Sequence, residues 1–268
     1  MTERAIGSLY DALHALEARW RTEAVYPVHK MLRFETADTE DIYDWIMSRV
    51  DPPEYSQILD AGCGVGFGAI RLAKRRACSV TGISLSENEV ASALRSAARL
   101  GVDNTVEFRC QSFDTLPQEA YDVVLAVESL KHSNDLRLSL QSLVRSVRPR
   151  GSLAVVEDLF TGNDDDALAR SLIKDWGLKA LYREADYLAH LDASRCQIFD
   201  LTGHVRRAGT LGVAIRLRAL GVLLKLVGAT TAMALRAFRG GLALERMYAN
   251  GAMAYKVIVC RPAGPARC

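Results

Sequence analysis

The stretch that most constrains this chain is Ile58-Leu-Asp-Ala-Gly-Cys-Gly-Val-Gly-Phe-Gly-Ala69. An apolar segment typical of a strand runs into a series of glycines, and a helical pattern follows. Glycine lets the backbone turn sharply and approach a ligand closely, and a helix N-terminus presents N–H groups without intrahelical partners. The stretch therefore predicts a strand–loop–helix unit with a ligand at its loop.

Short apolar runs alternate with helical patterns on both sides of this loop. Strands are expected at residues 58–61, 78–83, 105–109, 121–127 and 151–156, and helices at 67–76, 87–100 and 135–147. The helix at 87–100 is followed by Gly101, a typical C-cap. Strands joined by helical crossovers favour right-handed connections, so the expected fold class is α/β with a doubly wound, mostly parallel sheet.

The two ends of the chain have a different pattern. Apolar residues at helical spacing predict helices at 10–20 and 41–50, before Pro52-Pro53 interrupts the pattern. After Asp158, an acidic start at Asp164–Asp166 suits a helix N-terminus and predicts a helical run to about Tyr182. The remaining expected elements are a strand at 196–201, helical structure over 205–239 and a last strand at 252–260.

Charge is distributed unevenly along the 268 residues. The formal net charge of +2 divides into −8 for residues 1–202 and +10 for residues 203–268. A basic segment on an acidic body suggests an anionic or membrane-surface partner, and the alternative is a solvated helical face. Half of the chain is apolar and a quarter is charged, the composition of an ordinary soluble globular protein.

The six cysteines are scattered without a C-x-x-C pair or a cluster with histidine. This spacing argues against a zinc site and against a disulfide framework, so no metal is expected. The first twenty residues are polar and charged, unlike a secretory signal, and the longest uncharged stretch of the apolar tail, residues 226–235, is about half of a membrane span. We therefore expect a cytoplasmic protein of a reducing compartment.

Two ligand classes fit the glycine loop. Gly64 to Ala69 has the G-x-G-x-x-A spacing of a dinucleotide site, but the acid expected about twenty residues later is missing. The second strand instead ends in Gly82-Ile-Ser-Leu-Ser86. Asp60, just before the loop, would repel a pyrophosphate but suits a ligand with a positively charged amino-acid end.

Residues 59–66 match in full the L-D-x-G-C-G-x-G motif of the class I S-adenosylmethionine-dependent methyltransferases. The sequence resembles this family from about residue 58 to 158, and more loosely to the C-terminus. Val80 to Ser86 resembles the branch that includes tocopherol, sterol and cyclopropane-fatty-acid methyltransferases and antibiotic sugar O-methyltransferases. The resemblance implies a Rossmann-like sheet of seven strands with S-adenosylmethionine as cofactor. It further implies an N-terminal helical lid (1–50), a cofactor-binding core (51–160) and acceptor-covering helices with the last strands of the same domain (161–268).

The resemblance also implies where the cofactor lies. Its methionine end is expected at Asp60, Ala61, Gly62 and Gly64, and its ribose near Ile83 and Ser84, where other branches carry an acid. Ser112 stands where the family commonly has an aspartate for the adenine amino group, and Phe113 follows it. Serine can still accept one hydrogen bond.

Catalytic residues are expected after the fourth and fifth strands, because ligands of open α/β sheets lie beyond the carboxyl ends of the strands. Glu128 to Asp135 resembles the E-S/A-x-x-H-x-x-D stretch of the sterol, tocopherol and sugar methyltransferases. His132 has a reference pKa near neutrality and is our candidate general base, with Asp158 to orient or charge-stabilise it. Glu128 is expected to touch the cofactor, or to stabilise a carbocation in a C-methylating relative. The alternatives are an ordinary loop histidine and a solvated acid.

Residues outside the core are assigned to covering roles. Tyr26 and His29 are candidates for an N-terminal lid over the cofactor. The arginine-studded apolar segment 203–239 is expected to cover the acceptor pocket, with a homodimer face or contact with anionic lipid as alternatives. No nucleic-acid partner is expected, because the basic residues are not interleaved with aromatic ones.

The sequence thus predicts transfer of a methyl group to a small, largely apolar specialised metabolite. The first hypothesis is O-methylation with His132 as general base. The second is C-methylation of an isoprenoid or ring carbon, and the third is a non-catalytic cofactor-binding protein.

Overall fold

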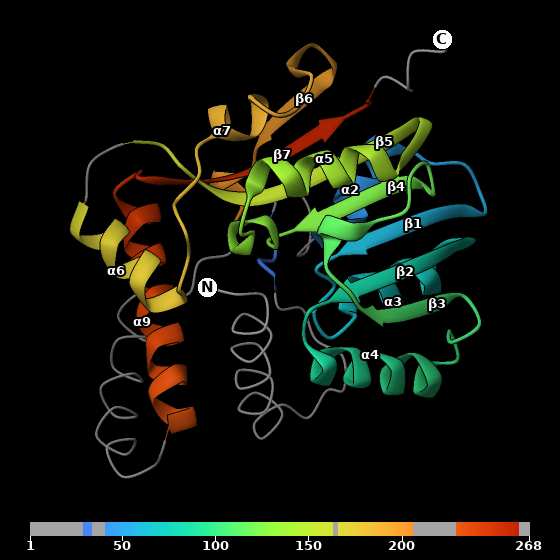
Figure 1. Cartoon of the computed structure of the whole chain (residues 1–268), viewed down its shortest axis with the longest axis horizontal. Coiled ribbons are helices and arrows are strands. Elements are labelled where there is room, and N and C mark those ends of the chain that lie inside the picture. The colour runs from blue at the N-terminus through green and yellow to red at the C-terminus, as the bar shows by residue number, and fades with distance from the viewer. Residues whose placement is uncertain (1–28, 34–40, 163–165, 206–228, 263–268) are drawn as a thin grey trace.

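The computed structural model describes residues 29–33, 41–162, 166–205 and 229–262 (Figure 1). Seven strands form one sheet in the order β3-β2-β1-β4-β5-β7-β6. Strands β1 to β5 pair in parallel, while β7 is antiparallel to both β5 and β6. The predicted seven-stranded, mostly parallel α/β sheet is confirmed. The strands are β1 (Ser56–Ala61), β2 (Cys78–Ser84), β3 (Val106–Cys110), β4 (Tyr121–Val127), β5 (Val147–Phe160), β6 (Cys196–Asp200) and β7 (Met253–Cys260).

Helices cover both faces of the sheet, and each face has its own apolar core. The first core contains residues of α2 (Ile42–Val50), α3 (Phe67–Arg75) and α4 (Glu87–Leu100). The second contains residues of α5 (Leu136–Ser146) and α7 (Glu184–Leu188). Helices α6 (Asp166–Trp176) and α9 (Ala229–Ala249) pack against each other, at the left of Figure 1. Four short 3-10 helices complete the described part: η1 (Phe113–Thr115), η2 (Leu130–His132), η3 (Ala193–Arg195) and η4 (Thr202–His204).

The central strands explain why the core is predictable from the sequence. A strand flanked by helices on both faces reads as a continuous apolar run, and every residue of β4 except Asp122 is buried. Asp122 is near the start of the strand, where its carboxylate accepts from Gln57 N at 2.8 Å and from Arg148 at 2.8 Å.

Several predicted boundaries are corrected by the structure. The helical run expected to Tyr182 ends at Trp176, because Gly177 takes a left-handed backbone with φ 64° that stops the helix. The last helix, in contrast, continues past its predicted end at Arg239 to Ala249. The helix expected at 10–20 and most of the segment 205–239 lie outside the described residues. None of the described helices is long and apolar enough to cross a membrane.

The cysteine spacing argued against a disulfide framework, and the structure contains a disulfide that the spacing did not predict. Cys196 and Cys260 form a disulfide, although 64 residues separate them in the sequence. They are register partners on the antiparallel strands β6 and β7, with Cα atoms 4.1 Å apart. Sheet pairing, which cysteine spacing does not reveal, brings them together.

Candidate active site

The glycine loop after β1 requires glycine for two reasons. Gly62, Gly64 and Gly66 have left-handed backbones, with φ of 88°, 53° and 83°. A Cβ on Gly62 would also collide with Ser129, the second residue after β4, whose hydroxyl donates to the carbonyl of Ala61 at 2.8 Å. The ends of β1 and β4 are thus in contact at the loop, as a cofactor cradle requires.

The loop is also fixed to the end of β2. The amides of Gly62 and Cys63 both donate to the carbonyl of Ile83 at 2.9 Å. Ile83 therefore supports the cradle through its backbone, while its side chain is buried in the second core.

Asp60 is fully buried at the end of β1. Burial raises the pKa of its carboxyl group to about 7, and the hydroxyl of Tyr43 limits this rise by donating to the two carboxylate oxygens at 3.0 and 3.2 Å. Tyr43 comes from α2 and was not predicted as a site residue. Its ring lies so close to Gly68 that a Cβ there would collide with it.

His29 lies beside Tyr43 and the start of α3. Its ring centroid is 5.2 Å from that of Tyr43 and 5.5 Å from that of Phe67, and its Nε2 is 2.9 Å from Asp41. The predicted contact of His29 with the cofactor region is therefore geometrically consistent, whereas Tyr26 lies outside the described residues.

A buried acid of α4, Glu89, contacts the end of β2, where the sequence had shown no acid in the strand itself. Ser84 is buried and its hydroxyl donates to Glu89 Oε2 at 2.7 Å. Glu89 is in the first turn of α4, where Ser86 caps its backbone N–H at 3.0 Å. The Ser86-x-x-Glu89 spacing of a capping box was the available sequence signal.

The end of β3 carries the two residues predicted for adenine. Ser112 N-caps η1 by accepting from Asp114 N at 3.2 Å, and Phe113 is half-buried against the second core. The Ser112 hydroxyl therefore already has a structural partner.

A largely buried cluster of charged and tyrosine side chains lies at the ends of β4 and β5. Strand β5 runs to Phe160, so Asp158, expected to follow the strand, lies within it. Glu128, at the end of β4, has a left-handed backbone with φ 52°, a conformation that is costly for a residue other than glycine and clusters at functional sites. Its carboxylate accepts from Lys30 N at 2.8 Å, Lys30 Nζ at 3.2 Å and Tyr255 Oη at 3.0 Å. Glu128 thus ties the N-terminal segment and β7 to the centre of the sheet.

Asp158 is held by two lysines and a tyrosine. Its carboxylate pairs with Lys30 Nζ at 2.7 Å and with Lys131 Nζ at 2.9 Å, and accepts from the hydroxyl of Tyr248. Burial would raise the pKa of Asp158, but the ammonium groups of Lys131 and Lys30 outweigh it and lower the pKa. The cluster's lysines and tyrosines were not predicted from the sequence, because they come from four separate segments.

Glu157, the neighbour of Asp158, has a different environment. It is 1% exposed, and Oε1 accepts from Lys131 N at 3.2 Å. Oε2 is 3.7 Å from Lys131 Nζ and has no hydrogen-bond partner within the described ranges. Burial raises the pKa of this carboxyl group to about 7, against the opposing effect of Lys131.

His132 is half-buried at the end of η2, where its N–H donates to Ser129 O at 3.2 Å. Burial, with the charge of Lys131, lowers the pKa of its imidazole to about 3. The imidazole is therefore neutral at physiological pH. The suggested support of His132 by Asp158 stays a prediction, since the contacts given above for Asp158 are with Lys30, Lys131 and Tyr248.

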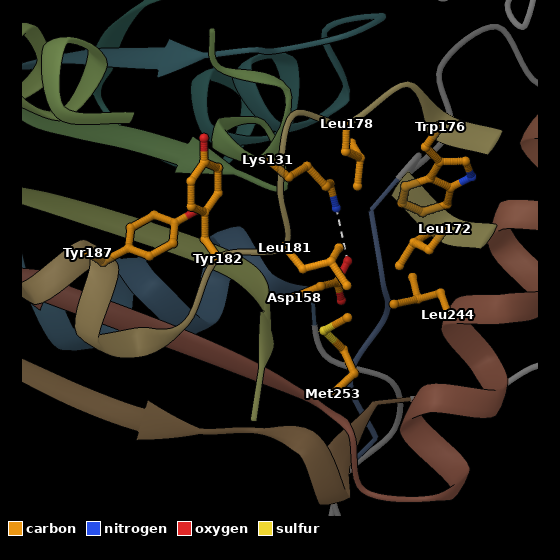
Figure 2. Close-up of a pocket in the computed structure, with 10 residues that line it drawn as sticks. All are labelled: Lys131, Asp158, Leu172, Trp176, Leu178, Leu181, Tyr182, Tyr187, Leu244 and Met253. Atoms are coloured by element: carbon orange, nitrogen blue, oxygen red, sulfur yellow. Dashed lines mark hydrogen bonds and ion pairs between the residues drawn. The ribbon is translucent and has the colours of Figure 1, made fainter. Parts of the chain in front are cut away.

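A small pocket adjoins the charged cluster (Figure 2). The ammonium of Lys131 points to Asp158. The ring of Trp176 lies on one side of this pair, and Tyr182 and Tyr187 lie on the other. Lys131 Nζ is 5.6 Å from the centroid of the Trp176 ring. The walls come mainly from α6, α9 and the segment between α6 and α7. The lining residues are Lys131, Asp158, Leu172, Trp176, Leu178, Leu181, Tyr182, Tyr187, Leu244 and Met253.

Fold and site together are typical of α/β proteins that bind a ligand in the crevice at the carboxyl ends of their strands. The glycine cradle and the acid at the end of β2 suit a nucleoside, and the buried acid of β1 suits an amine. Comparison with known proteins gives the family. A family described as a methyltransferase domain matches residues 59–155.

The 27-O-demethylrifamycin SV methyltransferase of Amycolatopsis mediterranei is 37% identical over 201 residues, which cover 71% of this chain and 72% of that protein. Methyltransferase GfsG of Streptomyces halstedii is 25% identical, with 84% of both chains covered. The chain belongs to the class I S-adenosylmethionine-dependent methyltransferases. It is an enzyme of specialised metabolism that uses S-adenosylmethionine as its cofactor.

Solved structures share the fold over nearly the whole chain. The [4+2]-cyclase SpnF superposes with a TM-score of 0.74 at 21% identity, covering 98% of both chains. A geranyl diphosphate methyltransferase in complex with GPP and sinefungin superposes with a TM-score of 0.71 at 17% identity, covering 97% of this chain and 98% of that one.

Proposed function

We propose that the enzyme methylates a hydroxyl group of a small, largely apolar specialised metabolite. The observation that carries this proposal is the small pocket of Figure 2, where the Lys131–Asp158 pair lies among mainly apolar and aromatic side chains. We infer that the acceptor places its hydroxyl near this pair and part of its apolar surface against the leucine and tryptophan side chains. The rifamycin relative, named for a 27-O-demethyl substrate, supports the choice of oxygen.

The cofactor supplies a methyl group already activated on a positively charged sulfur. We assign its amino-acid end to Asp60 and the turn at Ala61, Gly62 and Gly64. We assign its ribose hydroxyls to Glu89 with Ser84, because a carboxylate can accept from both hydroxyls of a diol. Ser112 and Phe113 are assigned to the adenine, and Ile83 supports the cradle.

His132 is the proposed first acceptor of the hydroxyl proton. Its neutral imidazole has the protonation state that a base needs, and it lies next to Lys131 in η2. The lowered pKa differs from the near-neutral value expected from the sequence and makes His132 a weaker base than a free imidazole. Glu128 and Asp158 hold the two lysines and shape the site. Alignment of acceptor and methyl group, with exclusion of water, supplies most of the remaining rate.

To test this proposal, the enzyme is given hydroxylated macrolactones, phenols and terpenoid alcohols together with cofactor labelled with ¹³C in its methyl group, and the products are analysed by NMR. A product whose label has the chemical shift of a methoxy carbon supports the proposal, and a carbon-bound methyl group in every product would favour C-methylation instead. His132→Ala should lower kcat by about 10²- to 10⁴-fold without changing cofactor affinity. Exposed His190→Ala is the matched control, and an unchanged rate in His132→Ala would remove His132 as the base.

A small-molecule acceptor is the partner that we infer, without nucleic acid. We also infer a cytoplasmic location, in line with the finding that no described helix could cross a membrane. The Cys196–Cys260 disulfide argues against the reducing compartment expected from the sequence, because disulfides are uncommon in a reducing cytoplasm.

A further inference from the structure

The buried charges beyond β4 and β5 do not cancel. Within the part of the chain that the structure describes, three carboxylates, those of Glu128, Glu157 and Asp158, meet the two ammonium groups of Lys30 and Lys131. A buried charge without a counter-charge costs several kcal/mol, and a carboxylate in that position takes up a proton instead. With all five groups ionised, the cluster has one negative charge in excess.

Glu157 is the member of the cluster suited to hold that proton. Glu128 and Asp158 each accept several hydrogen bonds from lysine and tyrosine side chains, which stabilise their ionised forms. Glu157 accepts only through Oε1 in the described structure, and its Oε2 faces Lys131 without a hydrogen bond.

The other groups around Glu157 do not neutralise it. Tyr187 of α7 contributes a neutral hydroxyl on the same side of the sheet. Lys256 is opposite Glu157 in the pairing of β5 with β7, but its ammonium lies 2.7 Å from Glu184 and 3.9 Å from Asp200. Burial and the charges of Asp158 and Glu128 raise the pKa of Glu157 to about 7, so a modest change in local charge moves a proton on or off it.

We propose that Glu157 is the proton store of this enzyme: ionised while the positively charged sulfonium is bound next to the cluster, and protonated once that charge has gone. The cluster is close to the cofactor cradle, since Glu128 precedes Ser129, which is bonded to Ala61. With the sulfonium present, three carboxylates face three positive charges. After methyl transfer the sulfur is neutral, and the excess negative charge draws a proton to Glu157.

The protons and bonds of the reaction balance in this scheme. The acceptor O–H bond and the bond between sulfur and methyl break, an O–CH₃ bond forms, and one proton is left for each methyl group transferred. Lys131 reaches both the pocket and Glu157 Oε2, at 3.7 Å. Burial would lower the pKa of this ammonium, but Asp158, Glu157 and Glu128 outweigh it and raise the pKa well above its ordinary value. Lys131 therefore keeps its charge, and the proton reaches Glu157 from His132, the first acceptor proposed above, or from water. That the proton comes from an acceptor hydroxyl rests on the proposed function. The effect of the sulfonium on the protonation of Glu157 does not.

The test measures protons released on ligand binding, so it needs no acceptor. Titration calorimetry in phosphate and in Tris, whose ionisation enthalpies differ, gives the number of protons released by S-adenosylmethionine and by S-adenosylhomocysteine. Both ligands have the same amino-acid end, so the protons that its ammonium displaces from Asp60 cancel in the comparison. The variant Glu157→Gln, described below, separates Glu157 from a response of Asp60 to the sulfonium. Near pH 7 we expect S-adenosylmethionine to release roughly half a proton more, because half of Glu157 is protonated there.

Glu157→Gln should abolish this difference while leaving the affinity for S-adenosylhomocysteine within a few-fold of wild type. Exposed Glu54→Gln should keep the difference and serves as the control. Equal proton release by both ligands in the wild type, or a difference that survives in Glu157→Gln, overturns the proposal. A failed O-methylation assay with the proton difference intact would instead count against the proposed function.

Infrared spectroscopy gives a readout that does not depend on the folding of a variant. In wild-type protein at pH 6.5, a buried protonated carboxyl band should be lost on addition of S-adenosylmethionine and persist with S-adenosylhomocysteine. Asp60 is also a buried acid with a raised pKa, so a second band lost with both ligands is expected from it. The absence of a band that only S-adenosylmethionine removes would contradict the assignment of Glu157.

Discussion

At the scale of single residues, the hydrogen bond between Tyr43 and Asp60 decides how well the cofactor end of the site works near neutral pH. Burial raises the pKa of Asp60 to about 7, and the bond from Tyr43 lowers it. Tyr43→Phe should therefore raise the pKa of Asp60 further and leave less carboxylate at pH 7. We expect the Kd for S-adenosylmethionine, measured by calorimetry, to rise roughly tenfold at pH 7, the effect of one hydrogen bond of about 1.4 kcal/mol.

The deficit of Tyr43→Phe should shrink at pH 8.5, where Asp60 is ionised in both proteins. Tyr55, which is 77% exposed, provides Tyr55→Phe as a control that should bind like wild type. A tenfold loss that is the same at both pH values would assign Tyr43 a packing role against Gly68 instead.

These residues also show where sequence reasoning about the site succeeds and where it stops. Asp60 lies near the carboxyl end of β1 and Glu128 follows β4. Both were predicted, because the carboxyl ends of parallel strands meet at one edge of the sheet. Tyr43 and Lys30 come from N-terminal segments whose approach to that edge is set by tertiary packing. No local pattern encodes such a contact. Glu157 was overlooked for a different reason: the sequence does not report that its Oε2 is buried without a hydrogen bond in the described structure, which distinguishes it from its neighbour Asp158.

At the scale of elements, the contact between α6 and α9 positions the aromatic wall of the pocket. A Cβ on Gly240 of α9 would collide with the ring of Trp176 at the end of α6, whereas a Cβ on Gly241 would meet nothing within 4 Å. Gly240→Ala should displace the Trp176 ring, destabilise the protein by about 1–3 kcal/mol and raise KM for the acceptor. Denaturant unfolding and acceptor kinetics check the two effects.

Gly241→Ala is the matched control, one residue away in the same helix. It should be neutral or stabilise by about 0.5–1 kcal/mol, because alanine loses less conformational freedom than glycine in a helix. Equal effects of the two substitutions would show that Trp176 does not depend on the space at Gly240.

The elements themselves were largely predictable, for identifiable reasons. The helix expected at 87–100 has the observed bounds of α4, because Ser86 caps its start and Gly101 ends it. Helix α6 was predicted too long, since the left-handed turn at Gly177 interrupts a pattern that is otherwise helical. The pairing of β6 with β7 places Cys196 opposite Cys260, and cysteine spacing cannot anticipate such a long-range pairing.

At the scale of the whole molecule, the charge asymmetry of the sequence finds a partial explanation in the covering helix α9. Arg239 pairs with Asp175 at 3.3 Å, and Arg236 donates to the carbonyl of Lys174 at 2.6 Å, so basic residues of α9 contact the C-terminal turn of α6. The Arg239 side chain is 63% exposed, whereas that of Asp175 is 1% exposed, so Arg239 gives a buried carboxylate its counter-charge. Apolar packing, with Leu172 and Leu244 lining the same pocket, also holds the two helices together.

The buried titratable groups together predict how the stability of the cofactor-free protein depends on pH. Asp60 and Glu157 have folded-state pKa values of about 7, above their ordinary values near 4. The native state therefore binds protons that the unfolded chain does not, and stability falls as pH rises toward and through 7. His132 has the opposite effect, because its pKa of about 3 lets only the unfolded chain bind a proton below pH 6.5.

Between pH 6 and pH 8 each of the two acids should lower the free energy of unfolding by about 1.4 kcal/mol. His132 should raise it by about 0.8 kcal/mol over the same range. We expect wild type to be roughly 2 kcal/mol less stable at pH 8 than at pH 6 in urea unfolding. Glu157→Gln should remove about 1.4 kcal/mol of that difference, whereas Glu54→Gln should leave it intact. A wild-type protein that is more stable at pH 8 would show that these carboxyl groups are not buried as protonated acids, and the proton store proposed for Glu157 would lose its physical basis.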